Sequence, residues 1–101
     1  MKRVIASLGL IFGIAGNAQA YVECPLTLAS IYAGDNGAIW ATSAENTTFM
    51  IRPEDPNLKN ALTLMTAALM GGNKVSVRFS SATECGGGVK YDFAGIWLLK
   101  K

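Results

Sequence analysis

The chain between residues 26 and 52 contains three short runs that favour β-strands, separated by polar turns. The runs cover residues 26–33, 38–43 and 48–52. The pair Asn36-Gly37 lies between the first two runs, and because both residues tolerate a positive φ it is a strong hairpin signal. Polar residues 45–47 separate the second run from the third. The pattern predicts a three-stranded meander.

After residue 52 the hydrophobic positions repeat with the period of an α-helix. The repeating residues, at spacings of four, three and four, are Leu58, Leu62, Met65 and Leu69. Such a stripe is typical of a helix that packs one face on a core. We expect Asp55 to cap its N-terminus with Pro56 in the first helical position, and Gly71-Gly72 to end it.

The pattern returns to period two after the predicted helix. Within residues 74–80 the side chains expected on one face are Val75, Val77 and Phe79. A glycine-rich segment follows at residues 85–88, and residues 91–99 form a closing strand. No repeat or linker divides residues 21–101, which we therefore interpret as one domain.

The resulting order is β-β-β-α-β-β, which predicts a mainly β fold with one helix. Five strands with a helix between the third and fourth is the order of the barrel found in oligonucleotide- and oligosaccharide-binding (OB) proteins. A ferredoxin-like or other open α+β sheet is the alternative, because element order alone does not fix strand pairing.

The predicted helix carries few polar residues. Between Ala61 and Met70 only Thr63 and Thr66 are polar, whereas an exposed helix usually has charged side chains on its outer face. Either the rest of the domain covers this helix, or the helix packs against other copies of the chain. We adopt the second interpretation, which predicts a homo-oligomer.

The first twenty residues have the pattern of a secretory signal peptide. Lys2 and Arg3 precede an apolar run at residues 4–15, and Ala18–Ala20 offers small residues for cleavage. The run is short for a membrane span, which argues against a retained N-terminal anchor. We expect a secreted or periplasmic protein, cleaved near Ala20 and without a membrane span in its mature form, residues 21–101.

Export changes the charge of the chain. Loss of Lys2 and Arg3 would remove the formal net charge of +2 and leave equal numbers of basic and acidic residues. A neutral chain lacks the basic surface expected of a nucleic-acid-binding protein. No nucleic-acid partner is therefore predicted.

Cys24 and Cys85 are the two cysteines of the chain, and both follow the predicted cleavage site. In an exported chain an even number most simply gives one disulfide, here closing a loop of about 60 residues. Chain entropy gives such a bridge a stabilisation of up to roughly 4 kcal/mol. Two free thiols or an intermolecular bond are the alternatives.

The residue types argue against an enzyme. The chain has no histidine, which removes the usual general base and the commonest zinc ligand, and a disulfide would remove the thiolate nucleophiles. Glu54-Asp55 is the adjacent carboxylate pair, and at a helix start such residues usually serve the helix dipole. We predict no catalytic residue, no metal site and no cofactor.

Aromatic and polar residues beside the predicted turns are the candidates for ligand contact. These ligand-binding candidates are Tyr32, Asp35, Asn36, Lys90 and Tyr91. The two tyrosines can stack on a sugar or a partner, and the polar residues can fix hydroxyl groups by hydrogen bonds. The alternative is that both segments are ordinary surface turns without a ligand. Trp40 and Trp97 are interpreted as core or subunit-interface residues.

With this order of elements the chain resembles the B subunits of the cholera-toxin-like family. The shared features are an export signal, a Cys near the mature N-terminus, a strand entered through residues 36–38, a central helix, and strands before and after the second Cys. The run Gly95–Leu98 also resembles the final strand of small exported relatives. The resemblance implies a homopentamer with helices lining a pore, recognition of cell-surface glycans, and an exported enzymatic partner subunit.

The sugar-site residues of that family are not carried over. In cholera-type subunits an aromatic residue that stacks on the sugar soon follows the second Cys, whereas here Cys85 precedes three glycines and the next aromatic is Tyr91. The leading hypothesis is an exported, non-catalytic protein that recognises a cell-surface glycan or protein. The alternative is a secreted or periplasmic structural or accessory protein without a ligand site.

Overall fold

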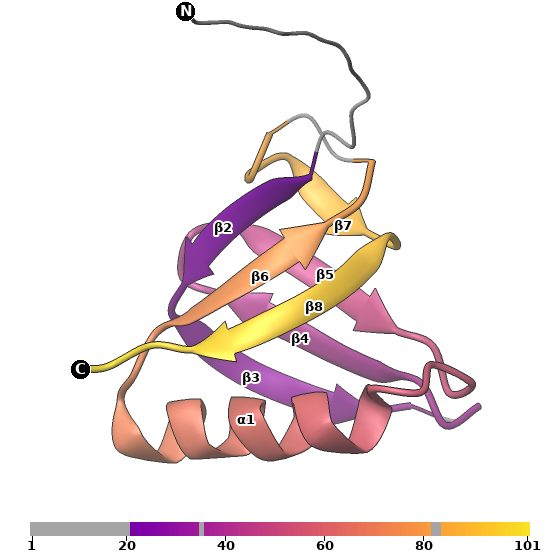
Figure 1. Ribbon diagram of the computed structural model, residues 1–101, viewed down its shortest axis with the longest axis horizontal. Coiled ribbons are helices and arrows are strands. Elements are labelled where there is room, and N and C mark those ends of the chain that lie inside the picture. The colour runs from indigo at the N-terminus through magenta and orange to yellow at the C-terminus, as the bar shows by residue number, and fades with distance from the viewer. Residues whose placement is uncertain (1–20, 35, 82–83) are drawn as a thin grey trace, which may run out of the picture.

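The computed structural model describes residues 21–34, 36–81 and 84–101, so the predicted signal peptide lies outside the described residues. The fold is mainly β with one helix, as predicted (Figure 1). The elements are β2 (Val22–Leu26), β3 (Leu28–Ala33), β4 (Ile39–Ser43), β5 (Thr47–Ile51), α1 (Leu58–Gly71), β6 (Val75–Phe79), β7 (Gly88–Lys90) and β8 (Phe93–Leu98).

The strands form two sheets rather than the predicted five-stranded barrel. One sheet has the order β2-β6-β8 and the other the order β3-β4-β5-β7, and neither closes on itself. The strand predicted at residues 26–33 corresponds to β3, whereas Leu26 ends β2, an additional strand on the other side of Thr27. The strand predicted at residues 91–99 corresponds to β8, and β7 is a further short strand that begins in the glycine-rich segment before it. β2 and β3 pair in different sheets, and so do β7 and β8.

The division between β2 and β3 at Thr27 has a specific cause. The Glu45 carboxylate accepts hydrogen bonds from the Thr27 N–H at 2.7 Å and from its hydroxyl at 2.9 Å. The Thr27 carbonyl accepts from the Ala44 N–H at 2.9 Å. Because Thr27 bonds to the turn between β4 and β5, the strand ladder is interrupted there.

The predicted hairpins are confirmed. The β3–β4 turn is closed by a hydrogen bond from the Gly34 N–H to the Ala38 carbonyl at 2.9 Å, and Gly37 has φ 83°. Asn46, in the polar turn between β4 and β5, has φ 64°. Both φ values lie in the left-handed region that Gly and Asn tolerate best.

The helix ends as predicted but begins later. Gly72 caps the C-terminus with φ 72°. At the other end Asn57, not Asp55, is the N-cap residue, because the Asp55 carboxylate accepts the Asn57 N–H at 2.8 Å and so holds a turn before the helix. Pro56 therefore precedes the first helical position.

The core-facing stripe of α1 differs from the predicted one. Its fully buried residues are Ala61, Met65 and Ala68, whereas Leu69 is 39 % exposed. The two alanines let the helix approach β3 and β8, which it crosses at one end of the two sheets (Figure 1). The larger leucines consequently lie on the flanks of the contact.

The core lies between the two sheets. In β6 the residues Val75, Val77 and Phe79 are fully buried, which confirms the predicted alternation. The buried ring of Phe49 in β5 stacks on Phe93, with centroids 5.9 Å apart, and meets the edge of Phe79 at 5.8 Å. These contacts join the sheets, since Phe79 and Phe93 belong to the other one.

Candidate ligand-binding face

The outer face of the four-stranded sheet carries a row of large side chains. Strand register places Tyr32 of β3 opposite Trp40 of β4, and Trp40 opposite Met50 of β5. The neighbours of Trp40 and Met50 along their strands, Ile39 and Ile51 among them, are buried. Since successive side chains in a strand point to opposite faces, the row lies on the solvent side.

Tyr91 extends this row from a distant part of the chain. It directly follows β7, which pairs with β5 in parallel. Its ring meets Trp40 edge to face, with centroids 6.0 Å apart and an interplanar angle of 86°. Tyr32 and Tyr91 are 59 % and 55 % exposed, so both rings offer surface to a ligand. We call Tyr32, Trp40, Met50 and Tyr91 the aromatic row.

Several hollows lie beside the aromatic row, and two of them share residues. One, of about 510 Å³, is lined by Tyr32, Asn36 and Trp40 among others. The other, of about 370 Å³, is lined by Tyr91 and by Ser80 and Asp92. Met50 and Arg52 line both hollows, so the two lie on either side of these residues. Volumes of this size are in the range of small-ligand sites.

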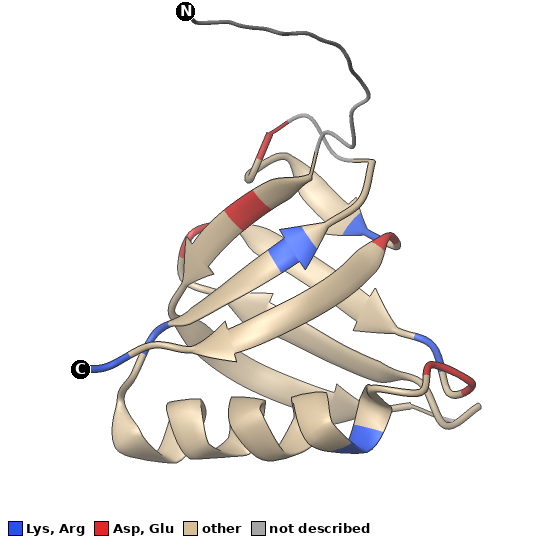
Figure 2. Cartoon of the chain, in the orientation of Figure 1, with Lys and Arg blue, Asp and Glu red and all other residues tan. Residues whose placement is uncertain are grey.

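Charge lies at the margins of this face rather than on its central strands. Figure 2 shows no charged residue on β3, β4 or β5 and a charged group just after β5. This group consists of Arg52, Glu54 and Asp55. The arrangement combines aromatic rings in the middle of the face with ionic hydrogen-bonding groups at its end, which suits a polar organic ligand better than an apolar one.

Most predicted ligand-binding residues lie near the aromatic row. Tyr32 and Asn36 line the larger hollow and Tyr91 lines the smaller one. Lys90 lies opposite Phe49 on the inner side of the sheet, where its ammonium donates to the Gly86 carbonyl at 3.2 Å and lies 5.8 Å from the Phe79 ring centroid. Asp35 lies outside the described residues.

Three residues of this face were missing from the predicted site: Trp40, Met50 and Arg52. The alternation that buries Ile39 and Ala41 carries the signal that Trp40 points outward. Its size favoured a core or interface interpretation from sequence. Met50 and Arg52 gain significance only because they line both hollows, which no local pattern indicates.

Trp97 lies on the other sheet and has a different environment. It is 45 % exposed, and the Arg78 guanidinium lies 4.9 Å from its ring centroid and 4.9 Å from that of Tyr21. Arg78 Nε also donates to the Glu23 carboxylate at 3.0 Å. Trp97 is therefore an exposed aromatic residue away from the aromatic row.

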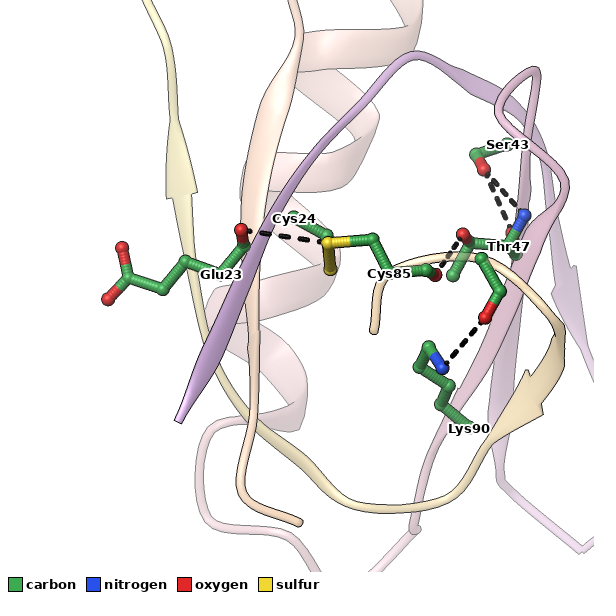
Figure 3. Close-up of a disulfide and its surroundings, with 7 residues drawn as sticks. Glu23, Cys24, Ser43, Thr47, Cys85 and Lys90 are labelled. Atoms are coloured by element: carbon green, nitrogen blue, oxygen red, sulfur yellow. Dashed lines mark hydrogen bonds between the residues drawn. A yellow bond between two sulfur atoms is a disulfide. The ribbon is translucent and has the colours of Figure 1, made fainter. Parts of the chain in front are cut away.

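The predicted disulfide is confirmed. Cys24 of β2, which is fully buried, is bonded to Cys85, with Cα atoms 5.5 Å apart (Figure 3). Cys85 lies three residues before β7, so the bridge connects the three-stranded sheet to the segment that enters the other sheet.

Glu45 has a lowered pKa. The largest cause is the hydrogen bond from the Thr27 N–H, which favours the charged carboxylate. Partial desolvation acts in the opposite direction and raises the pKa. The hydrogen bond from the Thr27 hydroxyl and the charge of the Lys74 ammonium, 3.7 Å away, lower the pKa further. These residues lie where β2 ends and β3 begins, and their contacts stabilise the fold at that point.

Among the described residues no group of three or more His, Cys, Asp or Glu side chains is placed to bind a metal ion. No helix in this part of the chain has the length and apolar character needed to cross a membrane.

No protein-family model, no curated protein and no solved structure matches the chain.

Proposed function

We propose that the protein is an exported, non-catalytic binding protein that recognises a cell-surface glycan through the aromatic row. The observation that carries this proposal is the contact between Trp40 and Tyr91, together with the two hollows on either side of Met50 and Arg52. It brings the half-buried Trp40 ring and the exposed Tyr91 ring, from two distant chain segments, onto one face of the sheet.

The chemistry of this surface suits a sugar. Aromatic rings stack on the apolar C–H faces of pyranose rings, and polar side chains around them hydrogen-bond to the hydroxyl groups. Tyr32 and Tyr91 supply exposed rings, and Asn36 and Arg52 supply donors at the edge of the larger hollow. The hollows are open, which suits a ligand presented at the end of a longer chain.

The arrangement of strands supports the resemblance to toxin B subunits. If β2 and β3 are counted as one bent strand and β7 and β8 as another, five strands remain, with α1 between the third and fourth. Hydrogen-bonded neighbours then run from β3 through β4 and β5 to β7, and from β8 through β6 to β2. The two bent strands connect these series, because β7 leads into β8 and β2 leads into β3. This order of strands and helix is the one expected of the OB fold, although the two sheets do not close into a barrel.

The outer face of α1 supports association of several copies. The exposed residues opposite the buried stripe include Thr63, Thr66, Ala67 and Met70, none of which is charged. Leu69 and Met70 are 39 % and 83 % exposed, so two adjacent apolar side chains reach solvent near the end of the helix. We propose a homo-oligomeric ring, a pentamer by the resemblance, that carries an exported enzymatic partner subunit.

A glycan array tests the proposed function. The exported protein is applied alongside a Trp40→Ala variant, which should lose the retained glycans. A Trp97→Ala variant is the matched control, because it removes an exposed tryptophan from the other sheet. Equal loss in both variants would place the site elsewhere, and retention of no glycan by the original protein would favour an accessory protein without a ligand site.

A further inference from the structure

The segment before Tyr91 is held by both sheets at a single residue, Cys85. From the three-stranded sheet, Cys24 forms the disulfide with it. From the four-stranded sheet, the Thr47 hydroxyl donates a hydrogen bond of 2.6 Å to the Cys85 carbonyl. Figure 3 shows Cys24 and Thr47 approaching Cys85 from opposite sides.

Thr47 is itself fixed in place. It is 1 % exposed, and its hydroxyl is satisfied by the bond to Cys85. The Ser43 hydroxyl accepts the Thr47 N–H at 3.1 Å and donates to the Thr47 carbonyl at 2.9 Å. Ser43 therefore fixes the backbone of Thr47 through both its N–H and its carbonyl group, and this fixes the position from which the Thr47 side chain reaches Cys85.

The segment beyond Cys85 depends on such anchors. It consists of three glycines, of which Gly87 and Gly88 have φ values of 95° and 112°. Glycine loses more conformational freedom on ordering than any other residue. The segment has little intrinsic tendency to hold this path, so its order comes from contacts with other residues. These are the bonds at Cys85, the hydrogen bond from the Lys90 ammonium to the Gly86 carbonyl, and the pairing of β7 with β5.

Tyr91 is positioned by this segment. Thr47 lies opposite Gly88 in the parallel pairing of β5 with β7, and Tyr91 follows β7 directly. The Thr47–Cys85 hydrogen bond therefore acts at the start of the segment whose end places the Tyr91 ring against Trp40.

We propose that Thr47 is a positioning residue of the ligand-binding face, which acts through Cys85 to hold Tyr91 against Trp40. The inference rests on the proposed function, because that function supplies the ligand. The order of the segment that places Tyr91 can nevertheless be measured without any ligand. Thr47, a buried polar residue of β5, would therefore affect ligand binding without contacting the ligand.

The test compares Thr47→Val with Thr47→Ser in the full exported protein. Valine preserves the shape of the side chain but leaves the Cys85 carbonyl without its donor, whereas serine retains the hydroxyl. Thr47→Val should expose the amides of residues 86–90 to faster hydrogen exchange and weaken the best array glycan by about 10-fold, the scale of one lost buried hydrogen bond. Thr47→Ser should restore both properties.

Thr63→Val is the matched control, because it also removes a threonine hydroxyl that donates to a backbone carbonyl, that of Lys59 at 3.0 Å, but on α1 and outside the four-stranded sheet. Ser43→Ala provides a second route to the same effect if Thr47→Val does not fold, because it removes the hydroxyl that holds the Thr47 backbone. Unchanged exchange in residues 86–90 in the variants that fold, or Thr47→Ser as impaired as Thr47→Val, would overturn the inference.

The two proposals fail in different ways. If the original protein retains no glycan, the proposed function fails, and hydrogen exchange still decides whether Thr47 orders the segment. If a glycan is retained and Thr47→Val binds it with the original affinity, the proposed function stands and the positioning role is wrong.

Discussion

The ring of Tyr91 meets the ring of Trp40 edge to face, with centroids 6.0 Å apart. Trp40 belongs to the first hairpin of the four-stranded sheet, whereas Tyr91 lies between β7 and β8, where the chain passes from one sheet to the other. The contact therefore links the candidate ligand-binding face to the point that joins the two sheets. Loss of order at that point would change the face itself.

Replacing Tyr32 or Tyr91 by alanine should weaken binding of an array-identified glycan by about 1–2 kcal/mol each, the scale of a lost stacking contact. Both rings are more than half exposed, so little folding stability should be lost with them. Isothermal titration calorimetry measures the affinity and thermal unfolding checks the fold. Unchanged affinity in both variants would exclude the aromatic row as the site.

Local sequence signals predicted the turns and the helix end well, for a physical reason. Gly37 and Gly72 occupy left-handed φ values, and few other residues adopt them without strain. The alternation of Val75, Val77 and Phe79 likewise reflects one buried face of a strand. In each case the residue type depends on the backbone conformation or the burial of that same residue, so the local sequence is enough to predict it.

The division between β2 and β3 had no such signal. Leu26 and Leu28 are both buried, so the alternation continues unchanged through Thr27 while the chain passes from one sheet to the other. The interruption depends on Glu45, which is distant in sequence. Periodicity reports which face is buried, but it does not report which strand lies alongside.

The candidate site was predictable in part for the same reason. Tyr32 and Asn36 lie beside a recognisable turn, and the sequence drew attention to them. Trp40 joins Tyr91 only through the parallel pairing of β5 with β7, a long-range contact made by a short strand that begins with glycine. Such a strand has low intrinsic propensity and leaves little pattern to recognise.

Removing the disulfide with Cys24→Ala and Cys85→Ala together should lower stability by roughly 2–5 kcal/mol, the range typical of small disulfide-bonded domains. For a domain of this size that corresponds to a fall in melting temperature of about 10 °C or more. Differential scanning calorimetry measures the change. The original protein treated with dithiothreitol is the control, and an unchanged melting temperature in both samples would contradict a stabilising role.

Truncation of Phe49 should be among the most damaging single changes in the core. The ring is fully buried and contacts Phe79 and Phe93 of the opposite sheet. Phe49→Ala should cost about 3–5 kcal/mol of unfolding free energy. Phe49→Leu, which keeps most of the apolar volume, should cost clearly less. Urea unfolding compares the two, and equal losses would show that packing between the sheets is not the cause.

Glu45 should make stability depend on pH in the acid range. Because its pKa is below the ordinary value of 4.5, its stabilising effect is complete above that value and is lost as the pH falls through the lowered native pKa. The difference in unfolding free energy between the original protein and Glu45→Gln should therefore be largest near neutral pH and shrink below pH 4.5. Urea unfolding across this range measures it. An exposed Glu54→Gln variant controls for the loss of one charge, and a difference that grows on acidification would contradict the assignment.

The outer face of α1 should be a contact between copies of the chain. Ala67 is exposed on this face, where the helix carries no charge beyond Lys59, near its start. Ala67→Glu would place a carboxylate in a contact made of threonine, alanine and methionine side chains, and burial of an unpaired charge is costly. Native mass spectrometry should show a ring, a pentamer by the resemblance, for the original protein and a shift toward monomer for Ala67→Glu.

Ala94→Glu makes the same substitution at an exposed position of β8 and should leave the assembly intact. A monomer in the original protein at tens of micromolar would exclude association through the helix, because even contacts of micromolar affinity persist at that concentration.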